Sequence, residues 1–146
     1  MGKFVFGLET LLRFREDIER KEKDDLFRRI YNHQMELRRH GELSEKYRET
    51  MNGLVREQAE RPAAYELSCY FLYLNRLTKE IYDCEQSLKR LQSEVQRQKE
   101  AVIEASKKKK TLAILKQKKE KEFFAGEEKR AQKEIDELVA VRHLSK

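Results

Sequence analysis

One hydrophobic stripe constrains the fold of this chain more than any other feature. Steps of three and four residues lead from Leu67 to Leu112 through fourteen positions, of which twelve are apolar. These positions are Leu67, Tyr70, Leu74, Leu77, Ile81, Cys84, Leu88, Leu91, Val95, Gln98, Val102, Ala105, Lys109 and Leu112. A period near 3.5 residues keeps one stripe of a helix facing a partner helix. The stripe therefore predicts a coiled coil and argues against disorder, in which apolar residues would be scattered.

The composition agrees with long helices. Charged residues make up 41% of the 146 residues and hydrophobic residues 38%, with one Pro, five Gly and no Trp. A compact globule needs turns, and turns usually draw on Gly and Pro. A chain with so few of both is typical of extended helices rather than of a globule.

The first half of the chain carries a weaker helical pattern. Leu8, Leu11 and Ile18 share one face. A second register follows with Leu26, Ile30, Leu37, Tyr47, Met51 and Leu54. The step from Ile18 to Leu26 does not fit a heptad, so we expect a stutter there. His33 and His40 occupy core-type positions about 10 Å apart along the helix axis, too far to share one metal ion.

A single proline marks the place where the chain can reverse. Pro62 lies in the segment EQAERPAAYE. Proline is excluded from helix interiors, disfavours helical geometry at the preceding residue and suits the first turn of a new helix. We predict an all-α fold, a long antiparallel two-helix coiled-coil hairpin with an overhanging C-terminal helix. It forms a single domain over residues 1–146, with helices at about 8–59 and 63–142 and a turn at about 60–62.

The unequal helix lengths leave the C-terminal end unpaired. With the turn near residue 62, position i faces about 124 − i, so roughly the last 25 residues extend beyond the first helix. The apolar residues of this overhang are Phe123, Phe124, Ile135, Leu138, Val139 and Val141. Apolar residues on a lone helix favour a partner, which predicts an insertion or docking role.

Positive charge is concentrated in the same region. Residues 107–146 hold 13 basic and 7 acidic residues, which is the whole net excess of +6. Attraction to nucleic-acid phosphates is one interpretation. The predicted pairing, however, places Lys107–Lys110 beside Glu16 and Asp17, and stacking aromatics are not interleaved with these four lysines. A solvated basic face and a binding role both stay open.

Other classes of site leave no pattern in the sequence. A Gly-rich phosphate loop, a Ser/His/Asp set and a His/Cys metal cluster are all absent, so we expect no enzyme activity, cofactor or metal. Cys69 and Cys84 are interpreted as small apolar residues in a reducing compartment. No window approaches the roughly 18 apolar residues of a membrane span, and no secretory signal is present. We expect a cytoplasmic protein.

The predicted hairpin tip is the most aromatic part of the chain. It contains Tyr65, Tyr70, Phe71, Leu72 and Tyr73, with Leu43, Tyr47 and Met51 a few turns away on the facing helix. A narrow seam needs only Tyr70 and Leu74 here. Phe71 and Tyr73 therefore predict an exposed aromatic patch suited to protein contact, with a broadened core as the alternative.

Both ends of the chain resemble the flagellar export protein FliJ family. The opening KFVFGLETLLRFREDIERKEKDDL, residues 3–26, resembles the family's aromatic-x-aromatic-x-Leu-Glu-x-Leu-Leu start. The close, residues 107–143, resembles its Lys-rich run, LKxKKxxEF-like segment and Gln-Lys-x-x-Asp-Glu helix. Matches there are Arg130, Gln132, Lys133, Asp136, Glu137 and Leu138, while Ala131 stands where many members carry Glu. The resemblance extends over essentially the whole chain.

The resemblance implies a stalk component of the flagellar type III protein export apparatus, cytoplasmic and peripheral to the inner membrane at the flagellar base. The family is similar to the gamma subunit of rotary ATP synthases. Its terminal end inserts into the hexameric export ATPase and promotes its assembly and activity. Its hairpin end contacts the cytoplasmic domain of the membrane export gate, and members bind export chaperones. Neither nucleic-acid binding nor direct membrane insertion is implied.

Site residues follow from the same resemblance and from the pattern. The expected gate contacts are Leu43, Tyr47, Tyr73 and Leu77. The expected contacts to the ATPase ring are Phe4, Phe6, Leu8, Phe123, Phe124, Arg130, Lys133 and Leu138. The alternatives are a generic coiled-coil scaffold, a nucleic-acid-binding coiled coil, or the equivalent stalk protein of a virulence type III secretion system.

Overall fold

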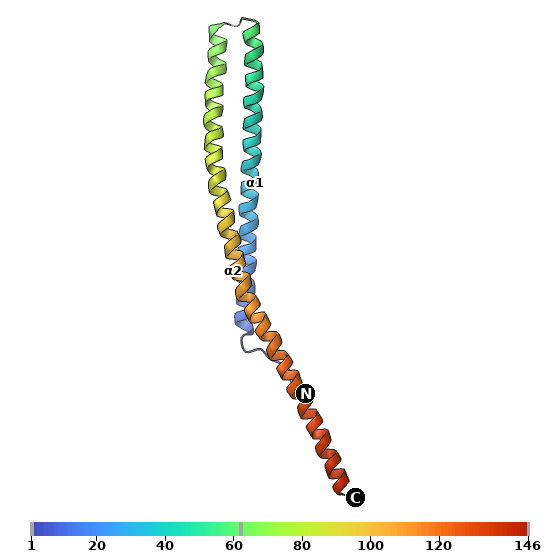
Figure 1. Ribbon diagram of the computed structural model, residues 1–146. Coiled ribbons are helices and arrows are strands. Elements are labelled where there is room, and N and C mark those ends of the chain that lie inside the picture. Colours follow the sequence, from blue (N-terminus) through green and yellow to red (C-terminus); the bar gives the residue numbers. More distant parts are fainter. Residues whose placement is uncertain (1, 62, 146) are drawn as a thin grey trace. The chain divides into compact units, whose positions relative to one another are not determined.

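Two helices account for nearly all of the chain in the computed structural model, which describes residues 2–61 and 63–145. Helix α1 runs over Glu9–Ala59 and helix α2 over Ala64–Leu144 (Figure 1). The described residues contain no strand. The all-α hairpin predicted from the heptad stripe is confirmed, because the long stripe of α2 has a second helix to pack against.

The chain divides into two compact units. The hairpin unit comprises residues Lys23–Ala101, and the terminal unit comprises Met1–Glu22 together with Val102–Lys146. Each helix contributes to both units. No helix of the described residues is both long and apolar enough to cross a membrane.

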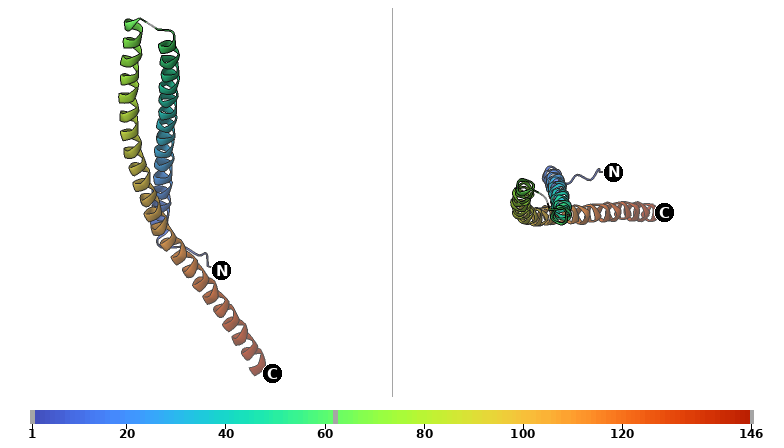
Figure 2. Two further views of the ribbon diagram at one scale, coloured as in Figure 1. Left: turned by 45° about the horizontal axis from the view of Figure 1, so that its top comes forward. Right: turned by 90° about the horizontal axis from the view of Figure 1, so that it is seen from above.

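The hairpin unit holds the two helices side by side and antiparallel (Figures 1 and 2). Contacts between them include the ion pair of Arg29 with Glu94 at 3.5 Å and the hydrogen bond between His40 and Glu85 at 3.1 Å. In both pairs the partner lies within one residue of the predicted position 124 − i. Its core cluster consists of Leu43, Leu77 and Cys84, with Tyr47, Ile81 and Leu88 packed against it.

The turn between the helices rests on a left-handed residue. Arg61 has a φ of 55°, and its backbone N–H donates to the carbonyl of Gln58 at 3.4 Å. A residue in this conformation just after a helix is a common way to end it, although glycine usually occupies the position. Pro62, on which the predicted turn depended, lies outside the described residues.

The terminal unit packs the start of α1 on α2. Glu9 forms an ion pair with Lys116 at 2.9 Å and Glu19 one with Lys109 at 3.0 Å. The predicted pairing of the lysine run with Glu16 and Asp17 is wrong for Lys109. Side chains lean toward the N-terminus of their own helix, so in an antiparallel pair Lys109 and Glu19 lean toward each other across about one turn.

The seam of α2 agrees with its stripe, whereas the seam of α1 differs from the prediction. None of the fourteen stripe positions of α2 is exposed. Besides Glu9, Ile18, Asp25, Ile30, Ser44 and Gly53, the covered positions of α1 form one series: Leu12, Arg15, Glu19, Glu22, Leu26, Arg29, His33, Glu36, His40, Leu43, Tyr47, Thr50, Leu54 and Glu57. These follow unbroken steps of three and four, so the expected stutter is wrong. Leu8, Leu11 and Leu37, counted toward the core, are exposed.

The unbroken register of α1 was hidden because nine of these fourteen seam positions are polar. Long Arg and Glu side chains cover the seam with their methylene stems and keep the charged groups at its edge. Ion pairs such as Arg29 with Glu94 then replace apolar contacts. Hydrophobicity alone therefore does not mark these positions.

The unpaired end of α2 begins later than the sequence predicted. Residues 128–145 are all exposed. Phe123, assigned to the overhang, is half-buried because the N-terminal segment reaches it: the rings of Phe4 and Phe123 lie 5.6 Å apart between centroids. We call residues 128–145 the C-terminal extension.

Candidate functional site

Four of the expected ring contacts line one cleft in the terminal unit. This terminal cleft, of about 680 Å³, lies between the N-terminal segment and α2. Phe4, Phe6, Leu8 and Phe123 line it, together with Leu115, Lys119 and Glu122, which the sequence analysis missed. Phe6 is buried and Leu8 is exposed. The result is an aromatic surface lined also by two lysines, Lys3 and Lys119, and by Glu122.

The other expected ring contacts lie on or next to the C-terminal extension. Phe124 and Arg130 border a second hollow of about 620 Å³, which Gly2 also lines. Lys133 and Leu138 lie farther along and are exposed, Leu138 by 69%. Ile135, Val139 and Val141 are exposed as well. This stretch presents apolar and charged side chains that contact no other helix of the terminal unit.

The lysine-rich run is partly neutralised within the terminal unit. The ammonium group of Lys116, 2.9 Å from the Glu9 carboxylate and helped by Arg13, holds the pKa of the Glu9 carboxyl below its ordinary value. Lys109 pairs with the buried Glu19. Lys107 lies 3.7 Å from Glu104 on its own helix. Acidic residues of the terminal unit therefore neutralise part of the positive charge of this run.

The expected gate contacts lie together in the hairpin unit, but they differ in accessibility. Leu43 and Leu77 belong to the core cluster, and Leu77 is only 2% exposed. Tyr47 is half-buried against that cluster, and Tyr73 is 39% exposed. Of the four, Tyr73 and Tyr47 can touch a partner without unpacking the helices, while the two leucines hold the tyrosines in place.

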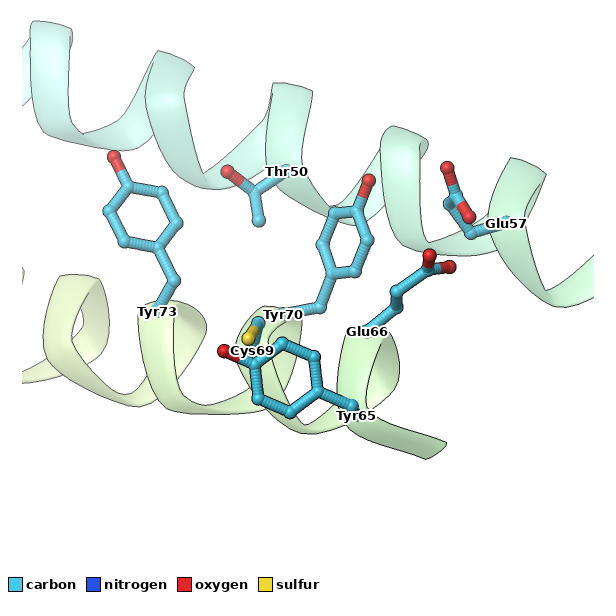
Figure 3. Close-up of a pocket in the computed structure, with 7 residues that line it drawn as sticks. All are labelled: Thr50, Glu57, Tyr65, Glu66, Cys69, Tyr70 and Tyr73. Atoms are coloured by element: carbon cyan, nitrogen blue, oxygen red, sulfur yellow. The ribbon is translucent and has the colours of Figure 1, made fainter. Parts of the chain in front are cut away.

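An open cleft of about 480 Å³ lies near the turn of the hairpin unit. We call it the tip cleft. Helix α1 contributes Thr50 and Glu57 to it, and α2 contributes Tyr65, Glu66, Cys69, Tyr70 and Tyr73 (Figure 3). The predicted aromatic patch consisted of Phe71 and Tyr73, and both are exposed. Tyr73 lines the cleft, but Phe71 does not. The carboxylates and Cys69 were missed, although the continued α1 register places Thr50 and Glu57 at the seam.

Thiols and histidines form no metal site in the part of the chain that the structure describes. Cys84 is fully buried, and burial raises the pKa of its thiol to about 11. Cys69, interpreted from sequence as a small apolar residue of the same kind, is instead exposed.

The family model described as flagellar FliJ protein matches residues 4–146. The chain belongs to the FliJ family. No curated protein and no solved structure matches it. The resemblance seen at the two ends of the sequence is thereby confirmed over almost the whole chain.

FliJ membership gives the chain a role in flagellar protein export, as a stalk-type and non-catalytic component. The family-like Gln-Lys-x-x-Asp-Glu segment lies in the C-terminal extension. There the Gln132 side-chain amide donates to Asp136 at 3.1 Å, one turn further along α2. That bond occupies one side of the helix, and Leu138 remains exposed. The bond between Gln132 and Asp136 supports the helix locally, and Leu138 beside it stays accessible.

Proposed function

We propose that this chain is the stalk of the export ATPase in flagellar type III protein export. In this proposal the terminal unit enters the hexameric ATPase ring and promotes its assembly and activity. The hairpin unit contacts the cytoplasmic domain of the export gate and export chaperones. The protein acts at the flagellar base, held at the inner membrane through these partners.

The C-terminal extension carries the proposal. It exposes Ile135, Leu138, Val139 and Val141 on a helix that no other segment of the terminal unit covers. Exposed apolar side chains on an unpaired helix favour a protein partner. Arg130 and Lys133 add positive charge on the same stretch. Residues 128–145 hold four basic and four acidic residues, so the extension offers an apolar surface with charges of both signs, which suits insertion into a ring of protein subunits.

The terminal cleft supplies a second contact surface for the ring. Its aromatic residues Phe4 and Phe123 pack on each other and leave part of their surface accessible. Aromatic side chains are enriched where proteins bind each other tightly. In the hairpin unit, Tyr73 and Tyr47 are the side chains we assign to the gate, with Leu43 and Leu77 supporting them from the core.

Nucleic-acid binding is the weaker proposal. Binding to phosphates needs unpaired basic groups, and Lys109 and Lys116 are already paired with Glu19 and Glu9. Acidic residues such as Glu120 and Glu122 are interspersed with the remaining lysines. The observed ion pairs favour a protein-directed surface.

The test replaces apolar side chains of the extension that are exposed, so their loss should not disturb the packing of the terminal unit. In the variant Ile135→Ser/Leu138→Ser we expect stimulation of the purified export ATPase to fall at least about tenfold, because two buried apolar contacts contribute roughly 1.5–3 kcal/mol each. Steady-state ATP hydrolysis, with and without the chain, gives the readout.

The control is Val55→Ser, which removes an equally exposed apolar side chain from the hairpin unit. It should leave stimulation unchanged. Full stimulation by Ile135→Ser/Leu138→Ser would contradict insertion of the extension. Binding of the wild-type chain to DNA at physiological salt, with a steep salt dependence, would favour the nucleic-acid alternative instead.

A further inference from the structure

The tip cleft combines features that its role in the hairpin does not require. A seam at this place needs the half-buried Tyr70 and the buried Leu74. Tyr65 and Tyr73 are exposed, Tyr65 by 78%, and still line the cleft. We propose that the tip cleft binds the guanidinium group of an arginine side chain presented by a partner protein.

The first argument is uncompensated negative charge. Glu57 and Glu66 come from the two different helices, and their carboxylates point toward one another across the seam (Figure 3). Neither forms an ion pair with another residue among those that the structure describes, whereas other carboxylates of the hairpin unit, such as Glu45 and Glu80, pair with Arg48 and Arg76. Two facing carboxylates without a cation attract one.

The second argument is the aromatic wall beside these carboxylates. The rings of Tyr70 and Tyr73 extend from α2 toward α1 (Figure 3). A cation over the face of a tyrosine ring is attracted by the charge distribution of the ring. A cation seated between Glu57 and Tyr70 would therefore meet a carboxylate and an aromatic face together.

These two features select arginine over lysine. The guanidinium group is planar, so one of its faces can stack on a tyrosine ring. Its N–H groups then donate, in the plane of the guanidinium group, to a carboxylate at its edge. An ammonium group is a compact, strongly hydrated charge and gains less from stacking.

The shape of the cleft favours a side chain held by its own protein over a free small molecule. Small-molecule sites usually enclose most of the ligand surface, and the exposed Tyr65 and Tyr73 show that this cleft is shallow. An arginine anchored in a partner needs only its tip to be covered, and arginine is among the residues that dominate protein interfaces. The proposal holds whether or not that partner is the export gate.

The test uses the full-length chain and the peptide acetyl-Gly-Arg-Gly-amide. We expect saturable shifts of the NMR signals of the Tyr65, Tyr70 and Tyr73 rings, while Tyr31 and Tyr82, which lie outside the cleft, do not respond. The matching peptide with citrulline, neutral and of nearly the same shape, should cause no saturable shift. A lysine peptide should bind more weakly than the arginine peptide.

The carboxylates are tested with Glu57→Gln/Glu66→Gln. Since exposed charge pairs contribute up to about 1 kcal/mol, binding should weaken about fivefold. The control Glu42→Gln/Glu100→Gln removes two exposed carboxylates of the hairpin unit outside the cleft and should bind normally. As a second measurement, the arginine peptide should slow maleimide labelling of Cys69, which also lines the cleft.

Three results would overturn the proposal. These are equal shifts with the citrulline peptide, equal weakening by the control variant, or no saturable response of the cleft tyrosines. Equal binding of the arginine and lysine peptides would overturn the assignment to guanidinium. The peptide experiment contains neither the ATPase nor the gate protein. A negative result would therefore overturn the arginine site without bearing on the proposed stalk function, which the ATP hydrolysis experiment tests.

Discussion

At the scale of single residues, the two cysteines show how position decides chemistry. Both were interpreted from sequence as apolar fillers. Cys84 fits that description, since it is 0% exposed and packs in the core cluster with Leu43 and Leu77. Cys69 lies beside the seam rather than in it, at the wall of the tip cleft, and is exposed. Their difference in reactivity follows from burial.

We predict that a thiol reagent modifies one cysteine of the native chain and two after unfolding. Burial raises the pKa of the Cys84 thiol to about 11, so at neutral pH the reactive thiolate is scarce and also shielded. Absorbance titration with a disulfide reagent, with and without denaturant, gives the count. In the native variant Cys69→Ser, no thiol should react rapidly with the reagent. Modification of two thiols in the native wild-type chain would contradict the burial of Cys84.

At the scale of elements, the ends of the helices are less well optimised than their seams. Acidic and basic residues stand at the favoured ends, with Glu9 in the first turn of α1 and Arg142 in the last turn of α2. These charges complement the helix dipoles. The end of α1 is different, because Arg61 adopts a left-handed conformation that side chains with a Cβ disfavour.

We predict that Arg61→Gly stabilises the hairpin. Glycine takes positive φ without the steric cost of about 1 kcal/mol that a Cβ imposes, and the exposed Arg61 side chain forms no ion pair with other described residues. The free energy of unfolding in urea, followed by circular dichroism, should rise by about 0.5–1 kcal/mol, reduced from the full value by the greater freedom of glycine in the unfolded chain. Arg56→Gly, inside α1, should lower it instead.

At the scale of the whole molecule, the two units carry different proposed contacts. The ring contacts all lie in the terminal unit and the gate contacts all lie in the hairpin unit. Substitutions at sites that share no contacts usually have independent effects. The two proposed activities should therefore be separable by substitution.

We predict that Tyr73→Ala weakens gate binding about tenfold or more, the usual loss for an aromatic residue at the centre of an interface, and leaves ATPase stimulation unchanged. Ile135→Ser/Leu138→Ser should do the reverse, and the combined variant should lose both by the sum of the separate effects. Pull-down with the gate domain and steady-state ATP hydrolysis measure the two activities. Loss of stimulation in Tyr73→Ala would show that the activities are coupled.

Agreement between sequence and structure is best where packing is apolar. The stripe of α2 predicts its own burial because each position from Leu67 to Leu112 needs the same neighbour, a facing helix. It is weakest for α1, where Arg15, Glu22 and Arg29 occupy the seam. Whether a long charged side chain covers a seam or extends into solvent depends on the carboxylate or amine opposite, which a local pattern does not contain.

The sequence by itself determined the all-α hairpin, its antiparallel pairing, the exposed C-terminal extension and membership of the FliJ family. These features follow from the hydrophobic period, the helix lengths and the order of the motifs, all of which can be read along the chain without knowledge of its tertiary contacts. Only the tertiary structure decided that Phe4 covers Phe123, that Lys109 pairs with Glu19, and that Glu57 and Glu66 meet beside three tyrosines. Such contacts join residues far apart in the sequence, and their geometry depends on side-chain direction and packing rather than on the period of either helix.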